Sequence, residues 1–141
     1  MISDDDFLVL LVKRVPEARP FVEEKYGLRE GEEPPREDTG ADLYENLLDI
    51  LTRSVLQPAL DEECPDGDLL RRCFGLVEDI YNIPGEHAPG AVYFQVLECL
   101  LESPRYLTNA IPFLVGNSRD RVSAMLEQYE VEGYERGLLP L

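Results

Sequence analysis

Hydrophobic residues recur at three- and four-residue steps along most of this chain, which is the period of an amphipathic helix. The clearest run is Tyr44, Leu47, Leu48, Leu51 and Val55, and the opposite face carries Glu45, Asp49, Thr52 and Arg53. No stretch alternates apolar and polar residues between hairpin turns, as the strands of a half-buried sheet would. The pattern therefore predicts an all-α protein.

Capping residues and helix breakers divide this pattern into seven predicted helices. Serine and aspartate at a helix start accept hydrogen bonds from free backbone N–H groups, proline favours the first turn, and glycine often follows the last turn. Ser3, Pro16 and Ser103 mark starts, whereas Gly27 and Gly116 mark ends. The helices are expected over about residues 3–15, 16–26, 41–57, 66–81, 89–101, 103–112 and 118–129. Their tight connections predict an irregular bundle or a stack of helical hairpins.

Two further expectations concern prolines and burial. Pro58 should end the third helix, and Pro112 should end or kink the sixth, because a proline inside a helix lacks a donor and clashes with the preceding turn. The helix over 89–101 carries apolar residues around more than half of its circumference. It is therefore expected to be the central and most buried helix.

Two segments have no apolar period. Residues 27–40 combine glycines, prolines and many charges, which predicts a flexible loop, and the tail over 130–141 is expected to pack loosely, as an extended strap or a frayed end. The chain has 141 residues, of which 44% are hydrophobic, enough for one core but not for two. A single helical domain over 1–141 is expected.

The charge balance narrows the choice of partner. The chain has 29 acidic and 13 basic residues, a formal net charge of −16, and such a surface repels phosphate backbones and anionic membranes. Direct binding of nucleic acid or of a membrane is not expected. A basic protein is the partner that this charge favours; the alternative is that the charge only keeps the protein soluble.

The longest apolar run also argues against the membrane. Phe7–Val12 is much shorter than the roughly 20 residues that cross a bilayer. It follows Asp4, Asp5 and Asp6, at the place where a secretory signal carries positive charge. We expect a buried helix in a cytoplasmic protein.

The residues with catalytic potential are few. His87 is the one histidine, in a Pro- and Gly-rich connector, and no phosphate-binding glycine motif or nucleophile elbow occurs. Cys64, Cys73 and Cys99 lack the close spacing of zinc ligands, and Cys73 and Cys99 are expected to be buried, reduced thiols. We therefore expect no catalytic, cofactor-binding or metal-binding residues, and no enzyme activity.

One carboxylate pair keeps an enzymatic alternative open. Residues 74–81 and 94–101 share a short pattern that places Glu78 and Glu98 at matching positions, where they can meet if the two helices pack. No Glu-x-x-His motif accompanies them to complete a dimetal site.

The densest group of charges lies between the third and fourth predicted helices. It lacks the alternating ligands of a calcium-binding EF-hand loop, so an exposed acidic turn is expected. This turn is the candidate partner-binding surface, and its acidic residues are Asp61, Glu62, Glu63, Asp66 and Asp68.

A family resemblance adds a specific hypothesis. Residues 71–80 (RRCFGLVEDI), 93–101 (YFQVLECLL) and 115–119 (VGNSR) resemble small acidic helical proteins of bacteria, some of which are regarded as immunity proteins of polymorphic toxin systems. The resemblance covers about residues 66–129. It implies a helical protein that binds and neutralises a basic toxin.

Two other hypotheses stay open at this point. The chain can be a structural or regulatory helical adaptor that forms a homodimer through exposed parts of its first helix. It can also be a DNA mimic whose carboxylates imitate phosphates.

Overall fold

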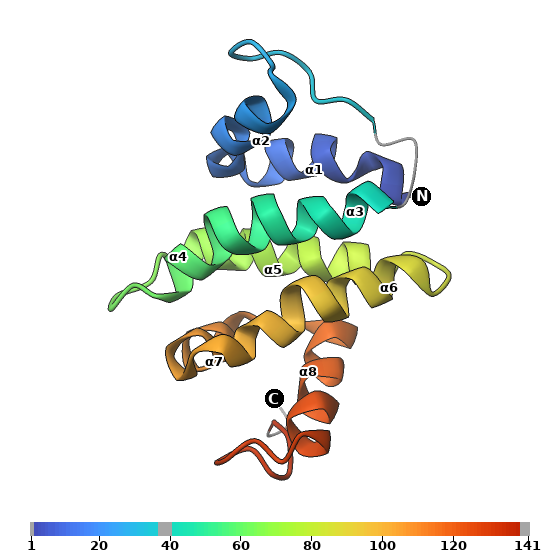
Figure 1. Ribbon diagram of the computed structural model, residues 1–141. Helices are drawn as coiled ribbons and strands as arrows, with labels where there is room; N and C mark the ends of the chain where they lie inside the picture. The colour runs from blue at the N-terminus through green and yellow to red at the C-terminus, as the bar shows by residue number, and fades with distance from the viewer. Residues whose placement is uncertain (1, 37–40, 139–141) are drawn as a thin grey trace.

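The protein is helical throughout the part that a computed structural model describes, residues 2–36 and 41–138. Seven continuous helical segments follow one another there, without strands, and confirm the predicted all-α fold (Figure 1). They are η1 (Asp4–Asp6) with α1 (Phe7–Arg14); η2 (Pro16–Ala18) with α2 (Arg19–Tyr26); α3 (Ala41–Asn46), η3 (Leu47–Leu56) and α4 (Gln57–Leu60); α5 (Gly67–Tyr81); α6 (His87–Val92), η4 (Tyr93–Leu97) and η5 (Glu98–Glu102); α7 (Pro104–Ala110) with η6 (Ile111–Phe113); and α8 (Gly116–Gln128).

The central helix is α5. It contacts α1, α4, α6, α8, η3 and η6, and its side chains Leu70, Phe74 and Val77 are completely buried. Figure 1 shows α1 and α2 at one end of the molecule and α8 with the C-terminal residues at the other. The prediction that the helix over 89–101 is the central one was therefore wrong. That helix exposes Phe94, with 54% of its surface accessible, whereas the matching Phe74 is buried.

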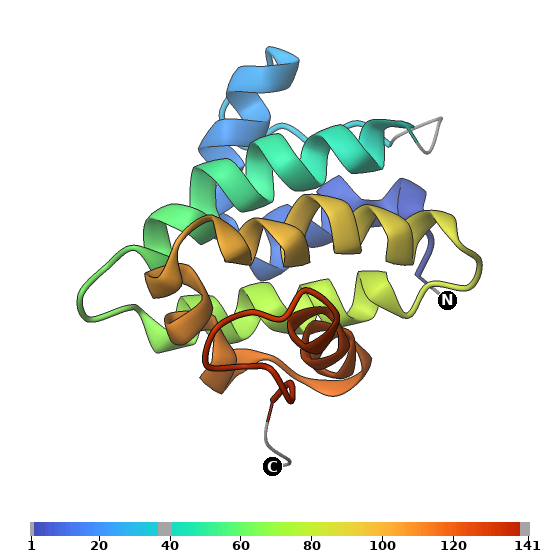
Figure 2. The same cartoon turned by 60° about the horizontal axis from the view of Figure 1, so that its bottom comes forward.

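Two long helical segments, 41–60 and 87–102, lie side by side and are joined by polar contacts (Figure 2). Each contains a π-helical stretch, η3 or η4, in which the backbone hydrogen bonds span five residues instead of four. The Thr52 hydroxyl donates to the Gln95 carbonyl oxygen over 2.6 Å. Arg53 pairs with Glu102 over 2.5 Å at the edge of the same contact.

Pro58 does not end the third helix as predicted, because the helix continues to Leu60. Pro58 is the second residue of α4, where α-helical bonding restarts after η3. Because the helix is continuous over 41–60, Pro58 lies inside it and lacks the N–H that would donate to the preceding turn. The predicted stop at Gly27 is confirmed, with a left-handed backbone at φ 64°. The predicted stop at Gly116 was wrong, because Gly116 is the first residue of α8.

The first part of the predicted flexible loop is attached to α2. The Gly31 N–H donates to the Glu23 carboxylate over 2.9 Å, and Arg19 donates to the Glu32 carbonyl oxygen over 3.2 Å. Residues 37–40 of that loop lie outside the described residues.

The C-terminal strap, residues 130–138, packs against α8. Val131, Tyr134 and Leu138 are partly buried against the core, and the Leu138 N–H donates to the Ser123 hydroxyl over 2.8 Å. At Gly137 a Cβ atom would lie 2.4 Å from the Ser123 Oγ, so the strap can approach α8 this closely only with glycine there. The sequence predicts loose packing for this tail; residues 139–141 of it lie outside the described residues.

Candidate functional site

The acidic turn is held in place by α7. Arg105 donates to the Asp61 carbonyl oxygen over 2.9 Å, and the Asn109 amide donates to the carbonyl oxygens of Leu60 and Glu62 over 2.8 and 3.2 Å. These bonds engage the backbone of the turn and leave its carboxylates to point outward. The turn therefore presents its charges from a fixed backbone.

The five acidic residues of the turn have different roles. Asp66 caps α5 by accepting the Leu69 N–H over 3.1 Å, and Asp68 pairs with Arg72 over 3.0 Å. Both are occupied within the fold. The remaining three side chains are exposed and form no hydrogen bond or ion pair with any other described residue: Asp61, Glu62 and Glu63. Only these three are free to meet a partner.

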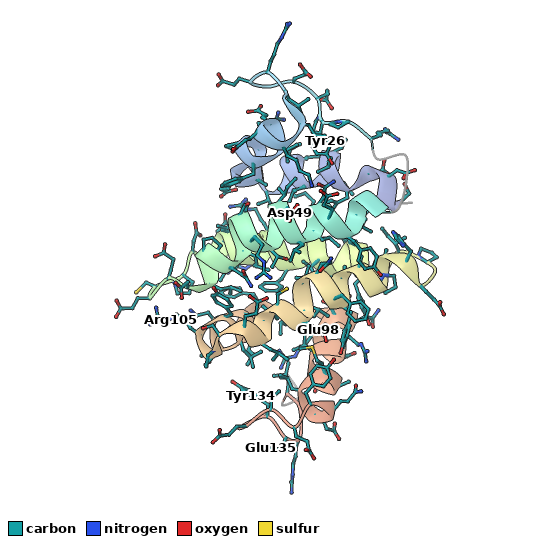
Figure 3. All side chains as sticks on the ribbon, in the orientation of Figure 1. Tyr26, Asp49, Glu98, Arg105, Tyr134 and Glu135 are labelled. Carbon is teal, nitrogen blue, oxygen red and sulfur yellow. The ribbon has the colours of Figure 1, made fainter. Side chains whose placement is uncertain are left out.

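Helix α7 lies between the acidic turn and the strap (Figures 1 and 2), and Pro104, Arg105 and Thr108 on it are exposed. Pro104 and Thr108 are four residues apart and form a ridge on its exposed face. Figure 3 places Arg105 on the side of α7 next to the turn and Tyr134 on the side next to the strap. The ridge thus separates two hollows.

The two hollows beside the ridge have different linings and similar sizes, about 340 Å³ each. Pro104 and Thr108 line both. The acidic cleft, on the side of the turn, is also lined by Glu62, Glu63, Arg105 and Asn109. The apolar cleft, on the side of the strap, is also lined by Leu100, Leu101, Ser103, Leu107, Val131, Glu132 and Tyr134.

A larger hollow of about 680 Å³ lies further along the strap and is lined by Thr108 and Tyr134 as well. Ile111 and Pro112 give it an apolar wall, and its charged lining consists of Arg119, Arg136 and one carboxylate, Glu135. This end of the α7 surface therefore differs in charge from the end near the acidic turn.

Sequence reasoning found the acidic turn but not the clefts. Thr108 stands between inward-facing residues of its helix, and nothing in its neighbours marks it as part of a ridge. Val131 and Tyr134 lie in a segment without periodicity, so their position against α7 depends on how the chain turns after α8.

Glu78 and Glu98 are not joined to each other by any hydrogen bond, because each holds a different end of α8. The Glu78 carboxylate accepts the backbone N–H groups of Asn117 and Ser118 over 2.9 and 2.8 Å, at the start of α8. Glu98 accepts the hydroxyl of Tyr129, which follows the last turn, over 2.7 Å. These two carboxylates therefore position α8.

The hydrogen bonds also affect the acidity of Glu78. Its partial burial works to raise the pKa, but the bonds donated by Ser118, Asn82 and Asn117 outweigh burial, so the pKa lies below its ordinary value of 4.5. The carboxylate is therefore charged at neutral pH and attracted by the positive end of the α8 dipole.

An aromatic patch lies near the other end of α8. Phe94 and Tyr129 are 54% and 42% exposed, and the Tyr129 hydroxyl lies 2.5 Å from the Tyr93 hydroxyl. The Arg121 guanidinium stacks 4.3 Å from the Tyr93 ring centroid. Aromatic residues and arginine are common at protein interfaces, so this patch is a second exposed surface of interest.

The remaining candidate residues are spread over the molecule. Cys73 and Cys99 are buried, as predicted, and burial raises the pKa of the first to about 12 and of the second to about 11; Cys64 is exposed. His87 begins α6, with its ring 5.3 Å from that of Tyr44. Within residues 2–36 and 41–138, no group of three or more His, Cys, Asp or Glu side chains is arranged to hold a metal ion, and no helix is long and apolar enough to cross a membrane.

Comparison of the chain with protein-family models, with curated proteins and with solved structures finds no match.

Proposed function

We propose that this chain is a non-enzymatic protein-binding domain, which binds a basic protein through the acidic turn and the adjoining face of α7. The observation that carries the proposal is the exposure of three carboxylates that have no partner among the described residues. Asp61, Glu62 and Glu63 are exposed and unpaired among the described residues, on a backbone fixed by Arg105 and Asn109. In the form that the resemblance to immunity proteins suggests, the partner is a toxin that binding neutralises.

The charge of the whole chain supports this proposal in a second way. A net charge of −16 attracts a basic partner and raises its association rate, by about tenfold to a thousandfold for strongly steered pairs. The attraction of the whole chain is not specific to one face. Three unpaired carboxylates on a rigid turn add a local preference for where the partner docks.

A homodimer through the first helix has less support from the structure. Phe7, Leu8 and Leu11 of α1 are completely buried in the core. The apolar residues left near the surface of α1 are Val9 and Leu10, which are only partly exposed.

The proposal can be tested by capturing partners from native cell extract with three forms of the protein as bait. The first is the unchanged chain. The second replaces Asp61, Glu62 and Glu63 by the corresponding amides. The third, a matched control, does the same to three exposed acids elsewhere: Glu24, Glu30 and Glu33.

A basic protein that is retained at low salt by the first and third baits, released by added salt and lost from the second would support the proposal. Equal capture by all three baits would show that the turn does not direct binding, and the proposed function would have to be abandoned. Mass spectrometry of the eluted proteins identifies the partner in the same experiment.

A further inference from the structure

The apolar cleft beside α7 is bordered by carboxylates on both sides. Glu132 of the strap lines the cleft itself, and Glu62 and Glu63 line the acidic cleft directly across the ridge. Pro104 and Thr108 belong to both clefts. Anything that lies across this ridge therefore meets an apolar wall and negative charge at the same time.

We propose that the ridge of α7 docks a basic amphipathic segment of the partner protein. Apolar side chains of that segment enter the apolar cleft, and its lysines or arginines lie against Glu62, Glu63 and Glu132. The inference rests on the proposed function and specifies the chemistry of the segment that binds.

The size of the apolar cleft supports a protein segment as its occupant. Its volume, about 340 Å³, lies near the lower limit of the pockets that hold whole small molecules, about 300–1,000 Å³. Its wall consists of the side chains of Leu100, Leu101, Leu107, Val131 and Tyr134. A few apolar side chains of a helix, spaced three or four residues apart, match a short apolar cleft beside a ridge of one helical turn.

Charge complementarity indicates that the docking segment is positively charged. The charged residues that line the acidic cleft are Glu62 and Glu63, which have no partner among the described residues, and one cation, Arg105, so the cleft is negative on balance. The larger hollow is lined by two arginines, Arg119 and Arg136, against one carboxylate, Glu135, so its charged lining is positive on balance. The basic side of the segment is therefore expected at the Pro104 end of the ridge.

Two synthetic peptides of equal length and charge provide the probe. One is an amphipathic helix of leucine and lysine with leucines at three- and four-residue steps, and the other has serine at each leucine position. Affinities for the full chain are measured by fluorescence anisotropy, and the binding site is mapped from amide chemical shifts. We expect the leucine peptide to bind about tenfold to a hundredfold more tightly, as for the burial of one or two apolar side chains. Its shifts should be concentrated at residues 100–108 and 131–134.

Two pairs of variants separate the apolar and charged contributions. Thr108→Trp fills the cleft from an exposed position and should remove the advantage of the leucine peptide, whereas Ala124→Trp, at an exposed site on α8, should preserve it. If Thr108→Trp does not fold, Val131→Ser removes part of the apolar wall instead.

The second pair of variants tests the charged contribution, with two glutamates of the acidic cleft replaced by glutamine in one variant and two glutamates elsewhere in its matched control. Glu62→Gln with Glu63→Gln should weaken both peptides by a similar factor, whereas Glu30→Gln with Glu33→Gln should weaken neither to that extent.

The outcomes distinguish the two proposals. Equal binding of the two peptides, or chemical-shift changes centred on Phe94 and Tyr129, would overturn the docking of an amphipathic segment on α7. The proposed function would remain in place if the Glu62 and Glu63 variant still weakened binding. If that variant binds both peptides as its control does, the turn does not attract cations and the proposed function fails.

Discussion

The contact between Glu78 and Gly116 leads to a quantitative prediction about α8. Gly116 begins the helix at φ 58°, and a Cβ atom there would lie 2.1 Å from the Glu78 Oε2. Gly116→Ala therefore adds two costs, the strain of a left-handed backbone and the displacement of the carboxylate from the N–H groups of Asn117 and Ser118. Gly27→Ala is the matched control, because Gly27 has a φ of 64° and no atom within 4 Å of its Cβ position.

The expected magnitudes follow from these costs. The backbone strain alone is about 1 kcal/mol, which is the expected loss of unfolding free energy for Gly27→Ala. Loss of a carboxylate that caps a helix adds about 2 kcal/mol, from the unsatisfied N–H groups and the lost charge at the dipole. We therefore expect about 3 kcal/mol for Gly116→Ala and about 2 kcal/mol for Glu78→Ala. The double variant should lose about 3 kcal/mol rather than the sum of about 5, since a missing carboxylate cannot be displaced a second time.

Urea unfolding followed by circular dichroism measures each of these four free energies by linear extrapolation. Two results would refute the reasoning. One is a Gly116→Ala cost equal to that of Gly27→Ala, which would mean that the carboxylate accommodates a methyl group. The other is additivity of Glu78→Ala and Gly116→Ala to within about 0.5 kcal/mol, which would mean that the two residues are not coupled.

Two further predictions concern ionisable groups. The hydrogen bond from Arg72 lowers the pKa of Glu17 to about 2, so their pair should stabilise the fold fully above pH 4.5 and lose its effect as the pH falls toward 2. Glu17→Gln should cost less than about 1 kcal/mol at neutral pH because the pair is partly exposed and screened by solvent, and urea unfolding should show this cost disappearing in acid; a cost that persists there would contradict the assignment. Of the three cysteines, only the exposed Cys64 should react rapidly with a disulfide reagent in the native protein, because Cys73 and Cys99 are buried with raised pKa values. Counting modified thiols by mass spectrometry, with Cys64→Ser as control, tests this, and rapid modification of the control would contradict the buried positions.

The helices could be predicted because their signals are local. Asp66 and Ser103 cap α5 and α7 as their positions in the sequence suggest, and Gly27 ends α2. Each of these signals involves residues within one or two turns of one another. The acidic turn could be found for the same reason, since its charges are adjacent in the chain.

The start of α8 shows what local signals cannot provide. The sequence predicts a helix start near residue 118, but α8 begins at Gly116, and the N–H groups of Asn117 and Ser118 are bound by Glu78, about forty positions earlier in the chain. The two similar segments also lie in different environments, since Phe74 is buried and Phe94 is exposed. Their environments are set by neighbours that belong to other helices, and the clefts beside α7 depend in the same way on the strap.

The two carboxylates that hold the ends of α8 also link the apolar cleft to the folding of that helix. Glu78 and Glu98 belong to the preceding helical segments, so α8 can be fixed only after those segments have formed. The strap follows α8 and contributes Val131 and Tyr134 to the wall of the apolar cleft. Local unfolding of α8 would therefore remove that wall while most of the core stayed intact. A partner bound across α7 should slow hydrogen exchange throughout α8, including amides that it never touches. The reason is that the partner binds only the molecules in which α8 is folded and the cleft has its wall.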